Sequence, residues 1–261
     1  VFSERKKMSS FQTSSSSFLP PVNQSWAHST CSHASLARAL KNKDVTAIEA
    51  DIIMGQCTTT TTTTMTDNDE NTKLLPIMAH PPSRSSDLNL NDFFRIILTA
   101  KALKDNNMLP LNSDNDDNDN QNQHHKGVVV LKLDIKEIEA VQPCLMEIRD
   151  SILSHNSNCS SNLGNPPFVF LNADILPGPG LREVSAKVNC EKFFSYSIEN
   201  DWHKDVHDNE VIDRTSFVGF SLGWSVDYRA ECSYTNDDIE KMMNAIAKYP
   251  LFEKSADLDA S

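Results

Sequence analysis

Several features that mark common protein classes are scarce or missing in this sequence of 261 residues. It has no run of about 20 consecutive apolar residues, the length that a transmembrane helix requires. It has only 7 glycines, and no glycine-rich loop follows the first apolar segment, which weighs against a nucleotide-binding sheet. The first residues, Val-Phe-Ser-Glu-Arg-Lys-Lys, lack the apolar stretch of a secretion signal. We therefore expect no transmembrane segment, and the cellular compartment stays open.

Positive charge is also scarce. The 24 Lys and Arg residues are outnumbered by 36 Asp and Glu residues, which gives a formal net charge of −12. This balance argues against a nucleic-acid partner and against a basic patch for membranes. The 6 cysteines are scattered without the spacing of zinc fingers or redox motifs, so we expect ordinary thiols.

Polar low-complexity blocks dilute the hydrophobic content to 39%. The clearest blocks are a Thr-rich and acidic stretch at 58–72 and an Asn/Asp tract at 112–123. Such compositions cannot bury enough apolar surface to fold, so we interpret them as insertions in a folded domain. The expected organisation is a disordered segment at 1–22, one domain at 23–250, and a tail or truncation point at 251–261.

Between these blocks, short apolar runs alternate with amphipathic runs, a pattern typical of parallel strands joined by helices. Six strand candidates follow one another at 24–28, 47–53, 75–80, 127–135, 168–174 and 217–224. Helical patterns follow most of them, at 34–40, 91–104, 136–153, 181–194 and 237–249. In the last of these, an apolar stripe of Ile239, Met242, Met243 and Ile246 is expected to pack in the core. The series predicts an α/β fold of about six βα units.

Titratable or amide side chains end nearly every strand candidate. In a (β/α) barrel the carboxyl ends of the strands converge on one mouth, whereas an open doubly wound sheet spreads them along an edge. The polar strand ends therefore favour a TIM-type (β/α) barrel over an open sheet.

The second and fourth strand candidates carry acids at alternating positions. Glu49 and Asp51 point to the same side of an extended strand, and so do Lys132, Asp134 and Lys136. Carboxylates side by side are costly to bury unless a cation intervenes, and oxygen ligands suit Mg²⁺ or Ca²⁺. We predict a metal site of Glu49, Asp51 and Asp134, with Lys132 and Lys136 available to an anionic substrate. Direct pairing of these acids with the lysines is the structural alternative.

Two histidines, His28 and His80, end the first and third strand candidates. Imidazole titrates near neutral pH, so a pair of histidines can supply the base and the acid for attack on a phosphodiester. Taken singly, each is more simply a hydrogen-bonded structural residue. Asn172 and Asp174 share one face of the fifth candidate, where Asn172 can donate to a phosphate or both can cap the Pro-Gly turn that follows.

Motifs along the chain carry a family resemblance. They are "WAHS", "IEADI", "PIMAHPP" followed by "SDLNL", "KGVVVLKLDIK", "LNADILPGPG" and "FSLGW". On these motifs the sequence, over about residues 26–249, is identified as a member of the Menorin-like family, whose animal members are also called family with sequence similarity 151.

The resemblance implies a barrel similar to that of the glycerophosphodiester phosphodiesterases and the spider-venom phospholipase D toxins. Carried over by position, it implies a metal pair at Glu49 and Asp51, a third acid at Asp134 with Lys136, and catalytic histidines at His28 and His80.

This sequence departs from the family pattern at two points. Cys31 stands where an Asn is expected, and the chain ends soon after its last helix, where family members continue with two further strands. We therefore expect a barrel that lacks its last two strands in a truncated sequence, which also does not begin with Met.

Two functions follow from the residues and the resemblance. One is metal-dependent hydrolysis of a phosphodiester, such as a glycerophosphodiester or a phospholipid head group, with the two histidines as acid and base. The other is a non-catalytic extracellular or membrane-associated interaction module that keeps the barrel. The sequence does not choose between an enzyme and a binding module, and the family resemblance allows either a secreted or a cytoplasmic location.

Overall fold

The structure is a computed structural model. It describes residues 24–59, 74–105, 128–158, 166–182, 184, 186–199, 204–207, 210–213, 218–227, 229 and 233–249. The expected terminal segments 1–22 and 251–261 lie outside these ranges, as do the insertion 112–123 and all but the first two residues of 58–72.

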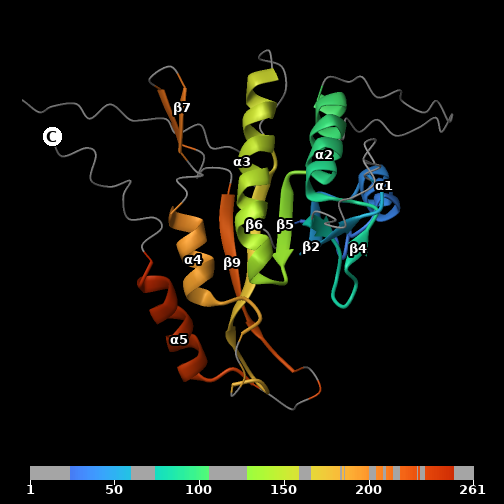
Figure 1. The fold of residues 1–261 in the computed structure, drawn as a ribbon. Coiled ribbons are helices and arrows are strands. Elements are labelled where there is room, and N and C mark those ends of the chain that lie inside the picture. The colour runs from blue at the N-terminus through green and yellow to red at the C-terminus, as the bar shows by residue number, and fades with distance from the viewer. Residues whose placement is uncertain are drawn as a thin grey trace, which may run out of the picture.

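The central sheet is parallel and curled like part of a barrel wall (Figure 1). Its strands are β1 (Trp26–Ala27), β2 (Ala47–Cys57), β5 (Val130–Ile135), β6 (Phe168–Pro177) and β9 (Val218–Ser225), adjacent in that order. Each of these neighbours is paired in parallel. All five correspond to predicted strands, which confirms a parallel α/β fold.

The third predicted strand has a different role from the expected one. β3 (Leu75–Met78) pairs antiparallel with β2, so it is the returning arm of a hairpin and not a member of the parallel series. β4 (Ser85–Ser86) adds a short parallel pairing to the end of β2. A separate antiparallel pair is formed by β7 (Lys204–His207) and β8 (Glu210–Asp213). Within the described residues the parallel series therefore has five strands, and the expected six βα units are not all present.

The helices are α1 (His33–Lys41), α2 (Leu90–Asp105), α3 (Val141–Asn158), α4 (Cys190–Glu199) and α5 (Asn236–Ala247). A 3-10 turn at Ile138–Ala140 leads into α3. Consecutive helices from α1 to α4 contact each other, and α2, α3 and α4 lie side by side over one face of the sheet (Figure 1). In that view the strands β5, β6 and β9 end toward the bottom.

Local signals explain where two helices begin. Thr235 caps α5 in a reciprocal arrangement, because its hydroxyl accepts from the Asp238 amide while Asp238 accepts from the Thr235 amide. The start of α4 is later than the predicted residue 181. The Asn189 side chain accepts from the Lys192 amide at 2.9 Å, which caps the helix at its observed start.

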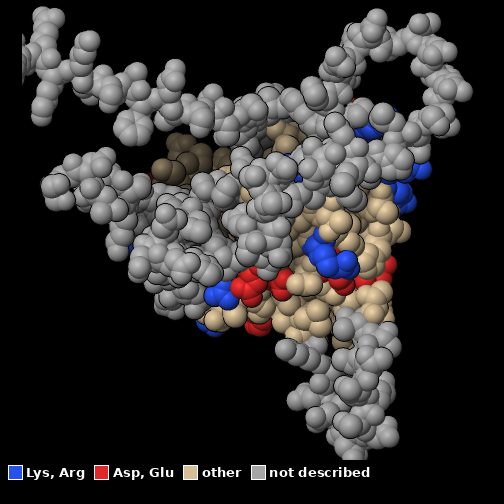
Figure 2. All heavy atoms as spheres, turned by 90° about the horizontal axis from the view of Figure 1, so that it is seen from above, with Lys and Arg blue, Asp and Glu red and all other residues tan. Residues whose placement is uncertain are grey.

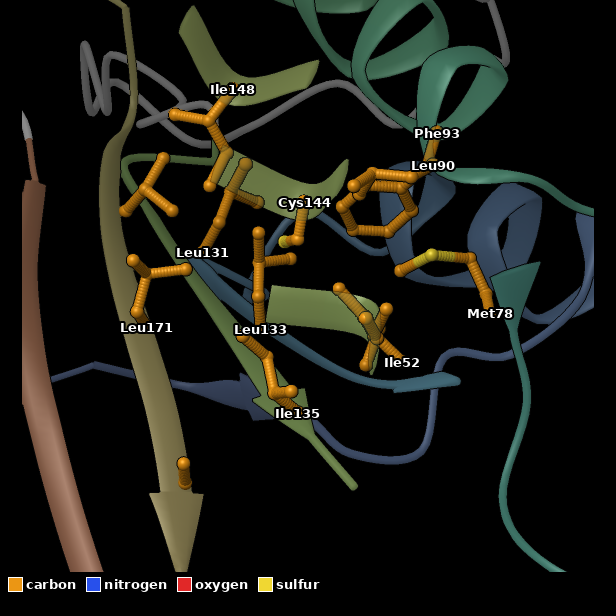
Figure 3. Close-up of a cluster of buried hydrophobic side chains, with 14 of the residues drawn as sticks. Ile52, Met78, Leu90, Phe93, Leu131, Leu133, Ile135, Cys144, Ile148 and Leu171 are labelled. Atoms are coloured by element: carbon orange, nitrogen blue, oxygen red, sulfur yellow. The ribbon is translucent and has the colours of Figure 1, made fainter. Parts of the chain in front are cut away.

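The core lies between the sheet and the helices (Figure 3). Alternate residues of β5 and β2, such as Leu131, Leu133 and Ile52, meet Leu145 and Ile148 of α3 in one buried cluster. The side chains between them in each strand face the other side of the sheet. The period-two alternation of these strands therefore buries an apolar face under the helices and leaves the polar residues on the opposite face.

The predicted core stripe of α5 is wrong in most of its members. Met242 is 5% exposed, whereas Ile239, Met243 and Ile246 are 51%, 61% and 40% exposed. Positions 239, 243 and 246 are spaced to form one face of a helix, and that face lies away from the cluster that holds Met242.

Among the described helices, none combines the length and the apolar character that crossing a bilayer demands. The expectation of ordinary thiols is confirmed at Cys31, Cys144 and Cys190, which are free cysteines, and Cys144 is fully buried.

Candidate functional site

Most predicted site residues lie on two adjacent rows across the polar face of the sheet. The strand register places Asp51 beside Asp134, Asp134 beside Asn172, and Glu49 beside Lys132. In-register parallel pairing sets equivalent side chains on neighbouring strands about 5 Å apart. Acids far apart in the sequence thus meet on the polar face of the sheet, where β2, β5 and β6 pair in register.

Glu49 is the centre of the first group of contacts. Its Oε2 contacts His28 Nδ1, and its Oε1 accepts from Lys132 Nζ at 3.0 Å. Burial raises the pKa of the Glu49 carboxyl, but the hydrogen bonds from His28 and Lys132 outweigh burial, and the net pKa lies below its usual value. Glu49 is therefore a carboxylate at neutral pH, and it orients the His28 ring.

Lys136 is the centre of the second group. Its Nζ lies 3.0 Å from Asp51 Oδ1 and 2.5 Å from Asp134 Oδ2. Burial lowers the pKa of the Lys136 ammonium, but the contacts with Asp134 and Asp51 outweigh burial and raise the net pKa. Asn172 Nδ2 donates to the other oxygen of Asp134 at 2.8 Å. Both lysines thus bind the acids instead of standing apart from them.

The two predicted catalytic histidines lie at different distances from this centre. His28 follows β1, is 68% exposed and contacts Glu49. His80 follows β3 on the segment that the Ala79 amide ties to the Asp51 carbonyl at 3.0 Å. Its Nδ1 lies 2.6 Å from the Pro81 carbonyl oxygen, and within the described residues its ring contacts none of the other site side chains. The structure brings His28 into the cluster and places His80 beside it.

A clamp next to the site, formed by Glu137, Met54 and Arg84, was not predicted from the sequence. Glu137 accepts from the Met54 amide and from Arg84 Nη1, each at 2.5 Å. It follows Lys136 directly, so it ties the end of β5 to the end of β2 and to the loop after His80. No short motif marks this clamp, because its three members belong to separate segments.

Cys31 approaches the site from the loop after β1. Its Sγ lies 3.8 Å from Asp51 Oδ2, and burial, more than the hydrogen bond and charge of Asp51, raises the pKa of the thiol to about 11. The thiol is therefore protonated at neutral pH. It can donate weakly to Asp51, a role that the Asn expected from the family resemblance would also fill.

The donor set suits a divalent cation chemically. Glu49, Asp51, Asp134 and Asp174 face the same side of the sheet, where Lys132 and Lys136 offset only half of their charge. Oxygen ligands with an excess of negative charge are those that Mg²⁺ and Ca²⁺ prefer. As the side chains lie, however, no group of three or more His, Cys, Asp or Glu side chains among the described residues is arranged to hold a metal ion. Lys136 lies between two of the acids, so cation binding requires this ion pair to open.

Charged side chains of both signs are exposed on the end of the molecule seen from above in Figure 2. On the described part of this face, basic and acidic side chains lie near each other, without a broad surface of one sign.

The fold and the site define a class: a parallel α/β protein with acids, lysines and a histidine clustered on the polar face of its sheet. Within that class the chain belongs to the Menorin family, because residues 22–254 match the family model described as the Menorin N-terminal domain. A curated relative is Protein FAM151B of Homo sapiens, which is 28% identical over 206 residues. That alignment covers 79% of this chain and 51% of the human protein, so the chain spans about half the length of this relative.

Proposed function

We propose that this chain binds a divalent cation on the polar face of β2 and β5 and hydrolyses a phosphodiester. The substrate class is a glycerophosphodiester or a phospholipid head group. One observation carries the proposal: Glu49, Asp51 and Asp134 come together on adjacent strands. Buried ion pairs add little to stability, and apolar residues of similar size in the same place often stabilise the fold more. A cluster of this kind is therefore better explained by chemistry than by folding.

Glu49, Asp51 and Asp134 would hold the cation, Mg²⁺ or Ca²⁺, whose positive charge would offset that of the phosphate. Lys132 and Lys136 supply the remaining positive charge for an anionic substrate. The Asn172 amide, which donates to Asp134, lies on the same row and can donate to a phosphate oxygen.

The histidines supply the proton transfers. His28 Nδ1 faces the Glu49 carboxylate, so it carries the proton there and leaves Nε2 free to accept one. In the proposed reaction, Nε2 takes a proton from the attacking water as its oxygen bonds to phosphorus. The ester P–O bond breaks, and His80 in its protonated form gives a proton to the leaving oxygen.

The fold supports the same proposal. The parallel order β1-β2-β5-β6-β9 and the curl of the sheet match one part of a closed (β/α) barrel. We propose that the Menorin domain is such a barrel and is remotely related to the glycerophosphodiester phosphodiesterase group. In such a barrel His80 would lie near Asp51, because the Ala79 amide donates to the Asp51 carbonyl at 3.0 Å.

Calorimetric titration with Mg²⁺ and Ca²⁺ tests the metal site. We expect saturable binding to the wild type and at least about tenfold weaker binding to Glu49→Gln and Asp134→Asn, because each variant loses a charged ligand. Asp150→Asn, on α3 outside the site, is the matched control. Equal binding to all four proteins would contradict the proposed ligands.

Turnover of a panel of glycerophosphodiesters tests the reaction. His28→Ala is expected to lower kcat by about a hundredfold or more, because a general base contributes roughly 10² to 10⁴. His33→Ala, on α1, serves as the control histidine. Loss of activity with an unchanged far-UV circular dichroism spectrum would assign the effect to chemistry and not to folding.

A second candidate is a non-catalytic interaction module. It is favoured by the lysine pairing, since Lys132 and Lys136 already form ion pairs with Glu49, Asp51 and Asp134 without any cation. This candidate predicts no turnover across the diester panel and unchanged partner binding in His28→Ala and His80→Ala.

A further inference from the structure

Asp174 is the one acid on the polar face of β6, and it differs from the other acids of the site. It lies two residues beyond Asn172 on the same face of the strand, roughly 7 Å further toward the mouth. It is half-buried. Among the described residues, none donates a hydrogen bond to it and none forms an ion pair with it.

The charges around Asp174 act only through space. Burial is the largest cause of its raised pKa, followed by the negative charge of Asp134, and Lys136, Lys187 and Lys132 counteract them. A half-buried carboxylate without a donor costs free energy that a donor from outside the chain would recover. The folded chain thus keeps an unfavourable group beside its site.

The neighbouring strand leaves room for this carboxylate. Asp174 pairs in register with Gly223 of β9. A Cβ on Gly223 would come 2.5 Å from Asp174 Oδ1, closer than two such atoms can lie. The absence of a side chain at position 223 therefore leaves the space that the carboxylate occupies. Ser221, two residues earlier on β9, continues the row of Asn172 and leaves a second small position on this strand.

We propose that Asp174 determines specificity by accepting hydrogen bonds from the alcohol part of a phosphodiester whose phosphate lies over Asp134 and Asn172. This inference rests on the proposed function and deepens it by naming the substrate class. The group that fits is a primary ammonium, which has hydrogen-bond donors and a positive charge. A trimethylated ammonium has the same charge as a primary ammonium but no N–H donor, and it fits poorly.

The experiment compares three soluble probes: glycerophosphoethanolamine, glycerophosphoglycerol and glycerophosphocholine. Binding to the wild type is measured by calorimetry in the presence of Mg²⁺, and turnover is measured in parallel. We expect the ethanolamine diester to bind about tenfold more tightly than the choline diester, the difference that one hydrogen bond to a charged group contributes. All three probes carry the hydroxyls of the common glycerol, so the comparison tests only the second alcohol. Weak binding of the glycerol diester supports an ammonium at Asp174, and binding as tight as that of the ethanolamine diester contradicts it.

Two variants localise the preference. Asp174→Asn removes the charge, and Gly223→Ala displaces the carboxylate while keeping it. Both are expected to reduce the ethanolamine over choline ratio to about one, whereas Glu191→Gln on α4 leaves it unchanged. A preference that survives both variants, or equal or absent binding of all probes by the wild type, overturns the inference. Selective binding without turnover supports the inference and contradicts the proposed hydrolysis, so the two failures are distinguishable.

Discussion

At the scale of single residues, Lys136 is the residue on which the acids of the site depend. Its ammonium lies between Asp51 and Asp134, and its side chain is 20% exposed. Removing one partner of a buried ion pair leaves an uncompensated charge. We expect Lys136→Met to lower the free energy of unfolding by about 2 kcal/mol, less than for a fully buried pair because solvent screens part of the charge. Urea denaturation with an unchanged m-value measures this loss.

The same variant links stability to the proposed cation. Millimolar Ca²⁺ or Mg²⁺ is expected to raise the free energy of unfolding of Lys136→Met more than that of the wild type. In the variant the cation no longer competes with the ammonium. The double variant Lys136→Met with Asp134→Asn is the control, since it removes a charge of each sign. In the wild type the folded pKa of Lys136 is above its unfolded value, so its contribution is complete below about pH 10 and is lost at more alkaline pH. If divalent cations do not stabilise Lys136→Met, the acids have a structural role alone.

At the scale of elements, an ion pair with a buried carboxylate joins the segment before α4 to the start of α5. Arg182 donates to both oxygens of Asp238, at 3.0 and 2.6 Å, and Asp238 is 1% exposed. The hydrogen bond from Arg182, followed by that from the Thr235 amide, holds the pKa of the Asp238 carboxyl well below its usual range. A depressed folded pKa means that this stabilisation is present above about pH 4 and is lost as the pH falls further.

We therefore expect Asp238→Asn to lower the melting temperature at pH 7 and to have a smaller effect near pH 2, where the wild type has begun to lose the same contribution. Thermal unfolding followed by circular dichroism across this range measures both effects. Asp237→Asn is the matched control, because Asp237 is exposed and pairs only with Lys241 one turn along α5 at 2.8 Å. An equal loss in the two variants would contradict the role of burial and of Arg182.

The sequence predicts most elements because apolar periodicity is a local property. The alternation in β2 and β5 gives both the buried face and the acid face of each strand, so Glu49 could be grouped with Asp51 from their spacing. Grouping them with Asp134 also required the expected barrel, in which the strands meet. The direction of β3 could not be read in this way, because alternation is the same in parallel and antiparallel strands. One signal was available: no helical pattern lies between the second and third strand candidates, and a parallel return needs a crossover.

Side-chain partners were less predictable than elements. That Lys136 lies between Asp51 and Asp134 depends on the register of two strands and on rotamers, which composition and spacing do not give. In α5, the stripe of Ile239, Met243 and Ile246 has helical spacing, but spacing alone does not say how much of a face the neighbouring elements cover.

At the scale of the whole molecule, stability is concentrated at the centre of the sheet. β2, β5 and β6 contribute fully buried residues to the main cluster, whereas β1 is two residues long and α5 has one buried apolar residue, Met242. Regions with few buried apolar contacts open without global unfolding. We therefore expect native-state hydrogen exchange to be slowest for amides of β5 and β6 and clearly faster for those of α5.

A core substitution distinguishes local from global opening. Leu133→Ala, in the central strand β5, is expected to lower the free energy of unfolding by about 3 kcal/mol, since Leu133 is fully buried. Amides of β5 and β6 that exchange only by global unfolding should then exchange faster, by the factor that corresponds to the same loss of free energy of unfolding. Amides of α5 should change little, because their opening leaves the centre of the sheet folded. If α5 and β5 exchange at the same rate in the wild type and accelerate together in the variant, the helix belongs to the same cooperative unit, and the gradient of stability proposed for this sheet does not exist.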